Sequence, residues 1–282
     1  MAEQLSDFLT RKFTPTPHLI GRGILPAKGK LIIGGPPKTN KSWLTLNLAL
    51  DLVRGRPGLG ALYKNGNQVL PIHKQFRVLY IEQELGDEGL RDRLKGHDAE
   101  HPGLATDLEC QGLPFFVKTR DTAMRLDTPD GRDFINAEID SVKPDLVIFD
   151  PLSKFNLVDE NSAQETGAVM RAVDHIIEDF GCAICIVHHT SKPFKDDVRE
   201  GLNRLRGSSA IAGDMDSFIE VTRLSDDHHP EPVLRLDFTL RRGEPIERLF
   251  VKRHRSGVVE FLGENYQFGT LQSGPRPSYR RL

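Results

Sequence analysis

The sequence predicts an α/β fold: a mostly parallel twisted sheet with helices on both faces and β-hairpins at its C-terminal end. Three observations support this class. As far as residue 180, short apolar runs typical of buried strands alternate with segments whose apolar residues have helical spacing. Two of these runs end in acidic residues, at the strand end where α/β sheets bind ligands. Later strands follow one another directly, as in hairpins, at 216–224, 232–241, 246–253 and 257–262.

The composition is that of a globular protein with a core, and it restricts the function classes. Of the 282 residues, 38% are hydrophobic and 28% are charged. With 38 basic and 40 acidic residues the net charge is −2, so any nucleic-acid site has to be a local patch. No segment has the roughly 18 consecutive apolar residues of a membrane span, and residues 1–13 lack the apolar stretch of a signal peptide. We therefore expect a cytoplasmic location and no membrane contact.

The chain is predicted to consist of a lead-in segment, one large domain and a tail. Prolines at 15, 17 and 26 predict that residues 1–29 are mostly extended or looped. Residues 30–263 hold the alternating strands and helices and are predicted to form one domain. Residues 264–282 end in a basic segment rich in proline and glycine, which predicts a mobile tail.

Residues 30–50 have the features of a phosphate-binding loop. Leu31–Ile33 predicts a buried strand, Gly34–Pro37 interrupts regular structure, and apolar residues at helical spacing follow Lys41. In such a loop, backbone N–H groups point inward and join the positive end of the next helix to hold a polyphosphate. A strand, a tight loop and a Lys-Ser pair that opens a helix therefore predict a nucleotide site.

One position departs from the pattern G-x-x-x-x-G-K-[ST] of these loops. Gly35 occupies the first glycine position, but Asn40 occupies the second. Asparagine tolerates unusual backbone angles, so the loop can still close. Lys41 is expected to reach the β- and γ-phosphates of ATP, and the Ser42 hydroxyl to hold Mg²⁺. The residues expected to contact the nucleotide are Gly35, Pro36, Pro37, Lys38, Thr39, Asn40, Lys41, Ser42 and Trp43.

Acidic residues follow two further predicted strands. The strand at 76–81 ends in Glu82 and Glu84, and the strand at 146–149 ends in Asp150. An aspartate in this place orients Mg²⁺ directly or through water, and its spacing of about a hundred residues from the phosphate loop supports that role. The two glutamates can equally be solvated charges. The remaining predictions in this part are a loop at 97–112, a strand at 113–117, helices at 130–141 and 167–180, and a loop at 151–166.

His188 and His189 follow another predicted strand, at 183–187. Adjacent strand residues face opposite ways, so one histidine is expected to point into the core and the other at the nucleotide site. No neighbouring residues complete a metal site around them. Cys182 and Cys185 are three residues apart in the same strand, so their side chains face opposite sides and a shared metal or disulfide is not expected.

The segment after these histidines is polar, and basic and acidic residues alternate in it. A solvated loop or short helix explains it as well as a DNA site does. DNA binding by such a loop would combine phosphate neutralisation with aromatic stacking, to which a second loop, after Asp150, could contribute. The candidate DNA-binding residues are Lys154, Phe155, Lys192, Phe194, Lys195, Arg199 and Arg204.

Five stretches of the chain, in this order, match a known family: GPPKTNKSWL, VLYIEQE followed by RDRL, PDLVIFDPLSKF, CIVHHTSKP and LRGSSAIAGDMDS. With these stretches in the family's order, the chain resembles the RecA-type ATPases of the RepA-like replicative helicase group, over roughly residues 20–260. The last two stretches separate the chain from kinases and small GTPases.

The resemblance implies a role for each motif. Glu84 matches the glutamate that activates the attacking water, ahead of Glu82, and Asp150 matches the acid that orients Mg²⁺. His188 or His189 matches a sensor of the γ-phosphate. The family members form rings, commonly hexamers, in which a neighbour supplies an arginine to the active site and inner loops hold single-stranded DNA.

Two residues depart from the family's pattern, and they leave alternative functions open. Asn40 replaces a glycine, and Asp216 occupies a place where relatives can carry an arginine, so Arg206, Arg223 or another residue would supply the catalytic arginine. An ATP-driven DNA helicase is the first hypothesis. An ATP-dependent DNA-binding or loading scaffold without unwinding activity is the second, and a recombinase-like filament the third.

Overall fold

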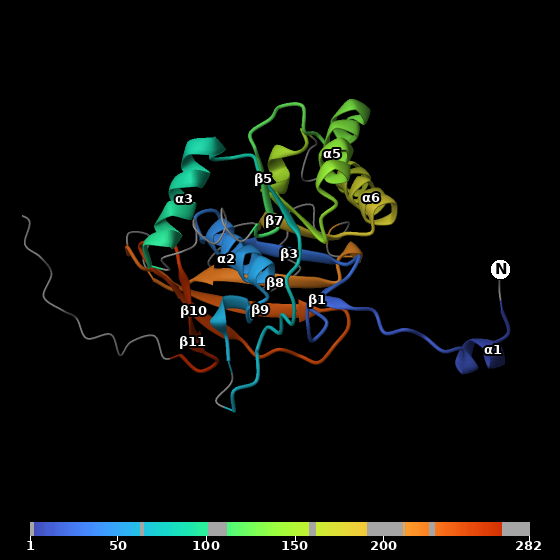
Figure 1. Cartoon of the computed structure of the whole chain (residues 1–282), viewed down its shortest axis with the longest axis horizontal. Helices are drawn as coiled ribbons and strands as arrows, with labels where there is room; N and C mark the ends of the chain where they lie inside the picture. The colour runs from blue at the N-terminus through green and yellow to red at the C-terminus, as the bar shows by residue number, and fades with distance from the viewer. Residues whose placement is uncertain are drawn as a thin grey trace, which may run out of the picture.

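The computed structural model has the α/β fold that the sequence predicts. It describes residues 3–62, 65–100, 112–157, 162–190, 211, 213–225 and 229–266. A nine-stranded sheet has the order β11-β10-β9-β8-β3-β7-β6-β4-β5, and its strands from β8 to β5 are parallel while β9, β10 and β11 are antiparallel (Figure 1). The strands are β3 (Lys30–Gly35), β4 (Val78–Glu82), β5 (Phe115–Thr119), β6 (Leu146–Asp150), β7 (Ala183–His189), β8 (Ser217–Arg223), β9 (Val233–Leu240), β10 (Leu249–Arg253) and β11 (Val259–Gly263).

Helices cover both faces of the sheet. The α-helices are α1 (Leu5–Thr10), α2 (Lys41–Arg54), α3 (Gly86–Glu100), α5 (Pro129–Val142) and α6 (Ala163–Phe180), and the 3-10 helices are η1 (Gly58–Gly60) and η2 (Leu152–Lys154). Because successive strand residues face opposite sides, Leu31 and Ile33 pack in the core beneath α2, whereas Ile32 packs in the core beneath α5 and α6. The parallel strands are therefore buried on both faces, as their continuous apolar runs predict.

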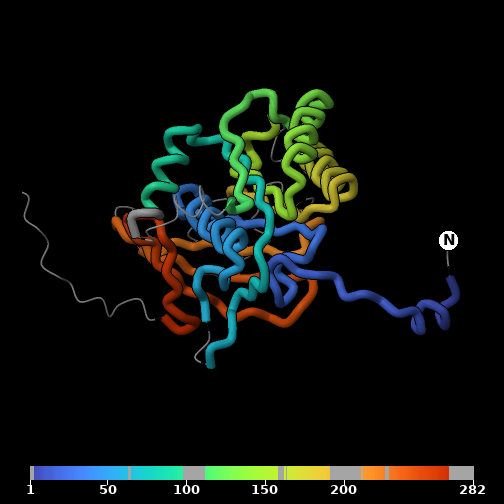
Figure 2. Tube along the Cα trace, viewed as in Figure 1, coloured from blue at the N-terminus to red at the C-terminus, as the bar shows by residue number. Residues whose placement is uncertain are grey.

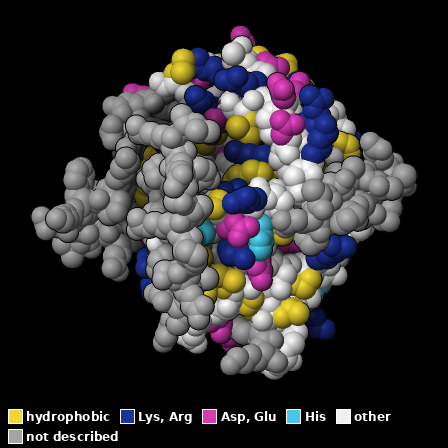
Figure 3. Space-filling view, turned by 90° about the vertical axis from the view of Figure 1, so that its left-hand side faces the viewer, with side chains coloured by type: hydrophobic (Ala, Val, Ile, Leu, Met, Phe, Trp, Pro, Cys, Tyr) yellow, Lys and Arg dark blue, Asp and Glu magenta, His cyan; other side chains and the backbone are white. Residues whose placement is uncertain are grey.

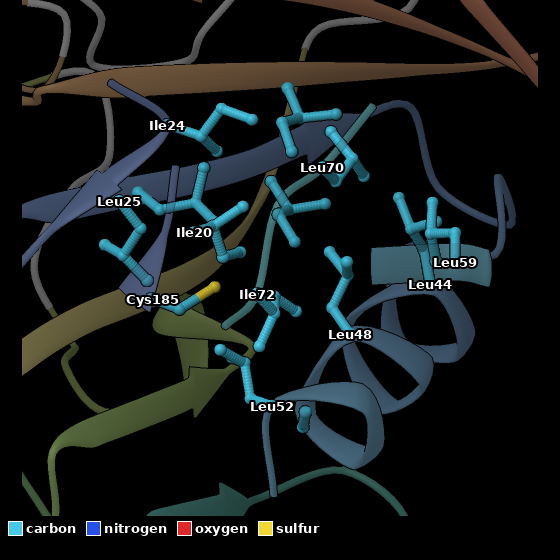
Figure 4. Packing of buried hydrophobic residues seen from close by; sticks show 14 of the residues in the cluster. Ile20, Ile24, Leu25, Leu44, Leu48, Leu52, Leu59, Leu70, Ile72 and Cys185 are labelled. Carbon is cyan, nitrogen blue, oxygen red and sulfur yellow. The ribbon is translucent and has the colours of Figure 1, made fainter. Parts of the chain in front are cut away.

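A small two-stranded sheet precedes the main one. It consists of β1 (His18–Ile20) and β2 (Leu25–Pro26), and its apolar side chains join the core on the α2 side. Figure 4 shows Ile20 and Leu25 from this sheet, and Ile24 from the turn between its strands, packed in the same cluster as Leu48 and Leu52 of α2. By contrast, residues 3–17 are exposed, and α1 lies at the end of an extended segment away from the body (Figure 2).

Some element ends differ from the predicted ones, for local reasons. The α6 helix begins at Ala163, inside the predicted loop, because the Ser162 hydroxyl accepts the N–H of Glu165 as an N-cap. The β7 strand extends through the two histidines, since His188 and His189 continue the parallel pairing with Gly34 and Gly35. Of the predicted loop 97–112, residues 97–100 belong to α3. The predicted tail beyond residue 266 lies outside the described residues.

Candidate active site

The phosphate loop connects the central strand β3 to α2. All six β3 residues are buried, between β7 and β8. The loop turns through two residues in the left-handed region, Lys38 and Asn40, both with φ of 65°. The unusual backbone angle expected at residue 40 is thus present without a glycine. The side chain of Thr39 braces the turn, because its hydroxyl donates to the carbonyl of Pro36 at 2.9 Å.

The Asn40 side chain brings a polar group into this loop. Its Nδ2 atom is buried and has no hydrogen-bond partner among the described residues. A buried amide donor without an acceptor is costly, and native structures leave few of them. An oxygen of a bound phosphate would satisfy it, so this orphaned donor is one observation that fits a nucleotide in the loop.

Lys41 opens α2 and folds back over the loop. Its ammonium group is buried and donates to the carbonyl oxygens of Gly35 at 2.9 Å and Pro36 at 2.8 Å. Burial lowers the pKa of Lys41 to about 8, against the opposing charges of Asp150 and Glu84. The structure thus places the Lys41 ammonium at the loop and within electrostatic range of two of the predicted acids.

Asp150, at the end of β6, is held by two hydroxyl groups. Its Oδ1 accepts from the Ser42 hydroxyl at 3.0 Å and its Oδ2 from the Tyr80 hydroxyl at 2.5 Å. Burial raises the pKa of Asp150 to about 6, although both hydrogen bonds act in the opposite direction. Ser42 and Asp150, the two residues expected to hold Mg²⁺, are therefore in contact. A hydroxyl and a carboxylate are the hard oxygen ligands that suit this ion.

The two glutamates after β4 occupy different environments. Glu82 is buried, and its carboxylate accepts the backbone N–H groups of Glu84, Leu85 and Gly86 at 2.8 to 3.0 Å, where α3 begins. Glu84 is exposed, and its charge is one of those that raise the pKa of Lys41. Of the two, Glu84 is the one with a carboxylate available beside the phosphate loop.

The histidines lie on the strand next to the phosphate loop. His188 is buried and His189 is half-buried, opposite Gly34 and Gly35 of β3. Within the described ranges, no group of three or more His, Cys, Asp or Glu side chains could hold a metal ion.

One candidate DNA-binding residue requires correction. Phe155 is fully buried and packs edge-on against Phe149, with 4.9 Å between the ring centroids, so the prediction that it stacks on DNA is wrong for this structure. The apolar ring completes the core beneath β6, and the short helix η2 leaves Lys154 exposed instead. Arg223, one candidate for the catalytic arginine, ends β8. The other candidate arginine, Arg206, and the remaining DNA-binding candidates lie outside the described residues: Lys192, Phe194, Lys195, Arg199 and Arg204.

Sequence reasoning missed two residues of this site. Tyr80 bonds Asp150, and Arg93 of α3 lies near both, since its charge lowers the pKa of Asp150. Arg93 and Arg253 flank Trp43, with guanidinium carbons 4.8 Å and 5.4 Å from its ring centroid. Figure 3, which faces the side where α3 and β10 lie, shows Lys and Arg side chains along this part of the molecule. Tyr80 and Arg93 lie in stretches that match the family, VLYIEQE and RDRL, but the sequence predicts no role for either; Tyr80 stands two residues before Glu82, on the same strand face.

The fold and the loop define a nucleoside triphosphatase of the phosphate-loop class. The AAA_25 family model, described as an AAA domain, matches residues 1–194, more than half of the chain. The chain therefore belongs to this family of RecA-like ATPases, which bind and hydrolyse nucleoside triphosphates. No curated protein matches the sequence. Among the described residues, no helix is long and apolar enough to cross a membrane.

Proposed function

We propose that this protein is an ATP-driven motor on single-stranded DNA, a helicase of the RepA-like kind that works as a homo-oligomeric, hexameric ring. The observation that carries the ATPase part is the convergence of Lys41, Ser42 and Asp150 at the phosphate loop, with the charge of Glu84 acting on the same lysine. The DNA and ring parts rest on the order and content of the motifs, which resemble those of the replicative helicases.

Each residue has a defined task in this proposal. Lys41 exchanges its bonds to the Gly35 and Pro36 carbonyls for bonds to the β- and γ-phosphates. Ser42 and Asp150 would hold Mg²⁺, which would neutralise charge on the phosphates. Glu84 orients the attacking water and accepts its proton. His188 or His189 senses the γ-phosphate, from the strand that leads directly into the candidate DNA loop.

The neighbouring subunit completes the site in this proposal. An arginine such as Arg206 would reach the γ-phosphate of the adjacent subunit and stabilise the charge that develops in the transition state. Arg199 and Arg204, with Lys192, Lys195 and Lys154, would bind the DNA backbone, which is an electrostatic and salt-dependent interaction.

A second candidate, an ATP-dependent DNA-binding or loading scaffold, is favoured by Asp216. Its Oδ2 accepts the backbone N–H of Lys30 at 2.9 Å, at the opposite end of β3 from the phosphate loop. This aspartate therefore supports the start of the strand, and it supplies no cation where relatives can carry an arginine. A chain without a catalytic arginine would bind ATP and assemble, but hydrolyse it slowly.

Two measurements separate these candidates. ATP hydrolysis is measured with and without single-stranded DNA, and particle mass is measured with and without ATP. The helicase proposal expects DNA to raise the hydrolysis rate, a ring-sized particle with ATP, and ATP-dependent separation of a forked duplex. Assembly and DNA binding without DNA-stimulated hydrolysis would favour the scaffold instead.

A further inference from the structure

The hydrogen bond between Tyr80 and Asp150 lies beneath the candidate Mg²⁺ site. The Tyr80 hydroxyl donates to Oδ2 of Asp150 at 2.5 Å, and both side chains are almost completely buried. None of the roles that the motifs imply uses this tyrosine. Its place in the sheet nevertheless gives it a direct effect on the aspartate.

The parallel register explains how the two side chains meet. Tyr80 of β4 pairs with Ile148 of β6, and Glu82 pairs with Asp150. Alternate residues of a strand share a face, so Tyr80 lies diagonally beside Asp150 on the same face of the sheet. A long aromatic side chain can span that diagonal.

The same register places two carboxylates opposite each other, and each has its own donors. Glu82 accepts three backbone N–H groups at the start of α3. Asp150 accepts the Tyr80 hydroxyl on one oxygen and the Ser42 hydroxyl on the other. These separate donor sets keep the two acids from competing for one partner.

The two oxygens of Asp150 therefore have different surroundings. Oδ2 faces a buried phenol of the sheet, whereas Oδ1 faces Ser42, which is partly exposed at the N-terminal end of α2. A protonated phenol donates to the carboxylate and does not act as a metal ligand. Only Oδ1 is directed toward the phosphate loop.

We propose that Tyr80 is a positioning residue for Mg²⁺: its hydroxyl fixes the Asp150 carboxylate so that Oδ1 is presented to the ion and its water ligands. This inference rests on the ATPase part of the proposed function. Partners that orient a metal ligand commonly contribute tenfold or more to metal affinity. Without the phenol, Oδ2 loses its donor and the carboxylate is free to rotate.

The test is the Tyr80→Phe variant, which removes only the hydroxyl. Nucleotide affinity is measured with a fluorescent ADP analogue in EDTA, and Mn²⁺ affinity of the ADP complex is measured by electron paramagnetic resonance. We expect Mn²⁺ binding to weaken about tenfold while metal-free nucleotide affinity stays within about twofold. The Mg²⁺ concentration that half-saturates hydrolysis should rise by the same factor, and excess Mg²⁺ should restore the rate.

Tyr266→Phe is the matched control, because it also removes a single tyrosine hydroxyl but in another part of the sheet. Tyr266 follows β11, and its ring lies beside Phe250 of β10. Thermal unfolding of each variant sets an assay temperature at which it is folded. Equal Mn²⁺ affinity in Tyr80→Phe and wild type would overturn the role of Tyr80, and so would a lower rate that excess Mg²⁺ does not restore. A wild-type chain that binds no Mn²⁺–ADP would instead overturn the ATPase proposal itself.

Discussion

Two sets of polar residues that follow or end β3, β4 and β6 differ in burial and in hydrogen bonding. Lys41 at the start of α2 and Glu82 and Asp150 at the ends of β4 and β6 are buried, and each has two or more hydrogen-bond partners in the surrounding backbone or side chains. Just beyond them, Glu84 and Lys154 are exposed. The buried set is held by hydrogen bonds within the chain, whereas the exposed set faces solvent.

Substitutions of the buried residues and of the exposed residues should therefore have different effects. A buried group that loses its partner destabilises the fold or the preformed site, because an unsatisfied polar atom is costly in the interior. An exposed carboxylate can be changed with little effect on stability. Its loss lowers only the rate of the reaction in which it takes part. Four substitutions test this division, and they are ordered by the size of the expected effect.

The largest effect is expected for Lys41→Ala. The variant removes the buried ammonium that now bonds the Gly35 and Pro36 carbonyls. Hydrolysis of Mg²⁺-ATP should fall by at least about 100-fold, because a preorganised charge on the transferred phosphate is lost. Nucleotide binding, measured by titration calorimetry, should weaken strongly. A rate equal to that of wild type would contradict the whole nucleotide-site interpretation.

Glu84→Gln comes next. The amide keeps the shape of the side chain but cannot accept a proton from the attacking water, so turnover should fall about 100-fold. ATP affinity and the midpoint of thermal unfolding should be close to those of wild type, because Glu84 is exposed. Full turnover in this variant would show that another group activates the water.

Glu82→Gln is its counterpart in the buried region. The amide retains one acceptor but loses the charge that interacts with the positive end of α3 and with several backbone N–H groups, so the free energy of unfolding should fall by about 2 kcal/mol. Turnover should change much less than in Glu84→Gln. Denaturant unfolding and steady-state hydrolysis measure the two effects, and the reverse pattern would exchange the roles of the two glutamates.

The sequence predicted the fold class and the places of the phosphate loop and of Asp150 at a strand end because these signals are local. Apolar runs indicate the buried strands. Lys41 and Ser42 come at the start of a predicted helix, and Asp150 comes at the end of a predicted strand. The Tyr80–Asp150 bond depends on the register between β4 and β6, which no local pattern contains. For the same reason, the sequence around Phe155 does not predict that its ring packs against Phe149.

The smallest effect is expected for Asn40→Gly. Asn40 lies in the phosphate loop, where its Nδ2 atom is buried but a bound nucleotide would be close. The backbone angle alone predicts that glycine is neutral or favourable here, because residue 40 has a positive φ and glycine adopts it without strain. The buried Nδ2 without a partner changes this expectation, since a phosphate oxygen is the acceptor that it lacks. We therefore expect ATP affinity in Asn40→Gly to fall by about tenfold, the effect of one hydrogen bond to a charged group.

Two further measurements interpret that result. Asn40→Asp keeps the size of the side chain but brings a negative charge to the phosphates, so it should weaken ATP binding more than glycine does. The unfolding free energy of the ligand-free Asn40→Gly variant should be within about 1 kcal/mol of wild type, because the Nδ2 atom of the lost amide has no hydrogen-bond partner in the described part of the chain. If Asn40→Gly binds ATP as wild type does, the amide makes no phosphate contact. Asn40 would then serve the loop only through its backbone angle, as part of the region that the chain fixes without a ligand.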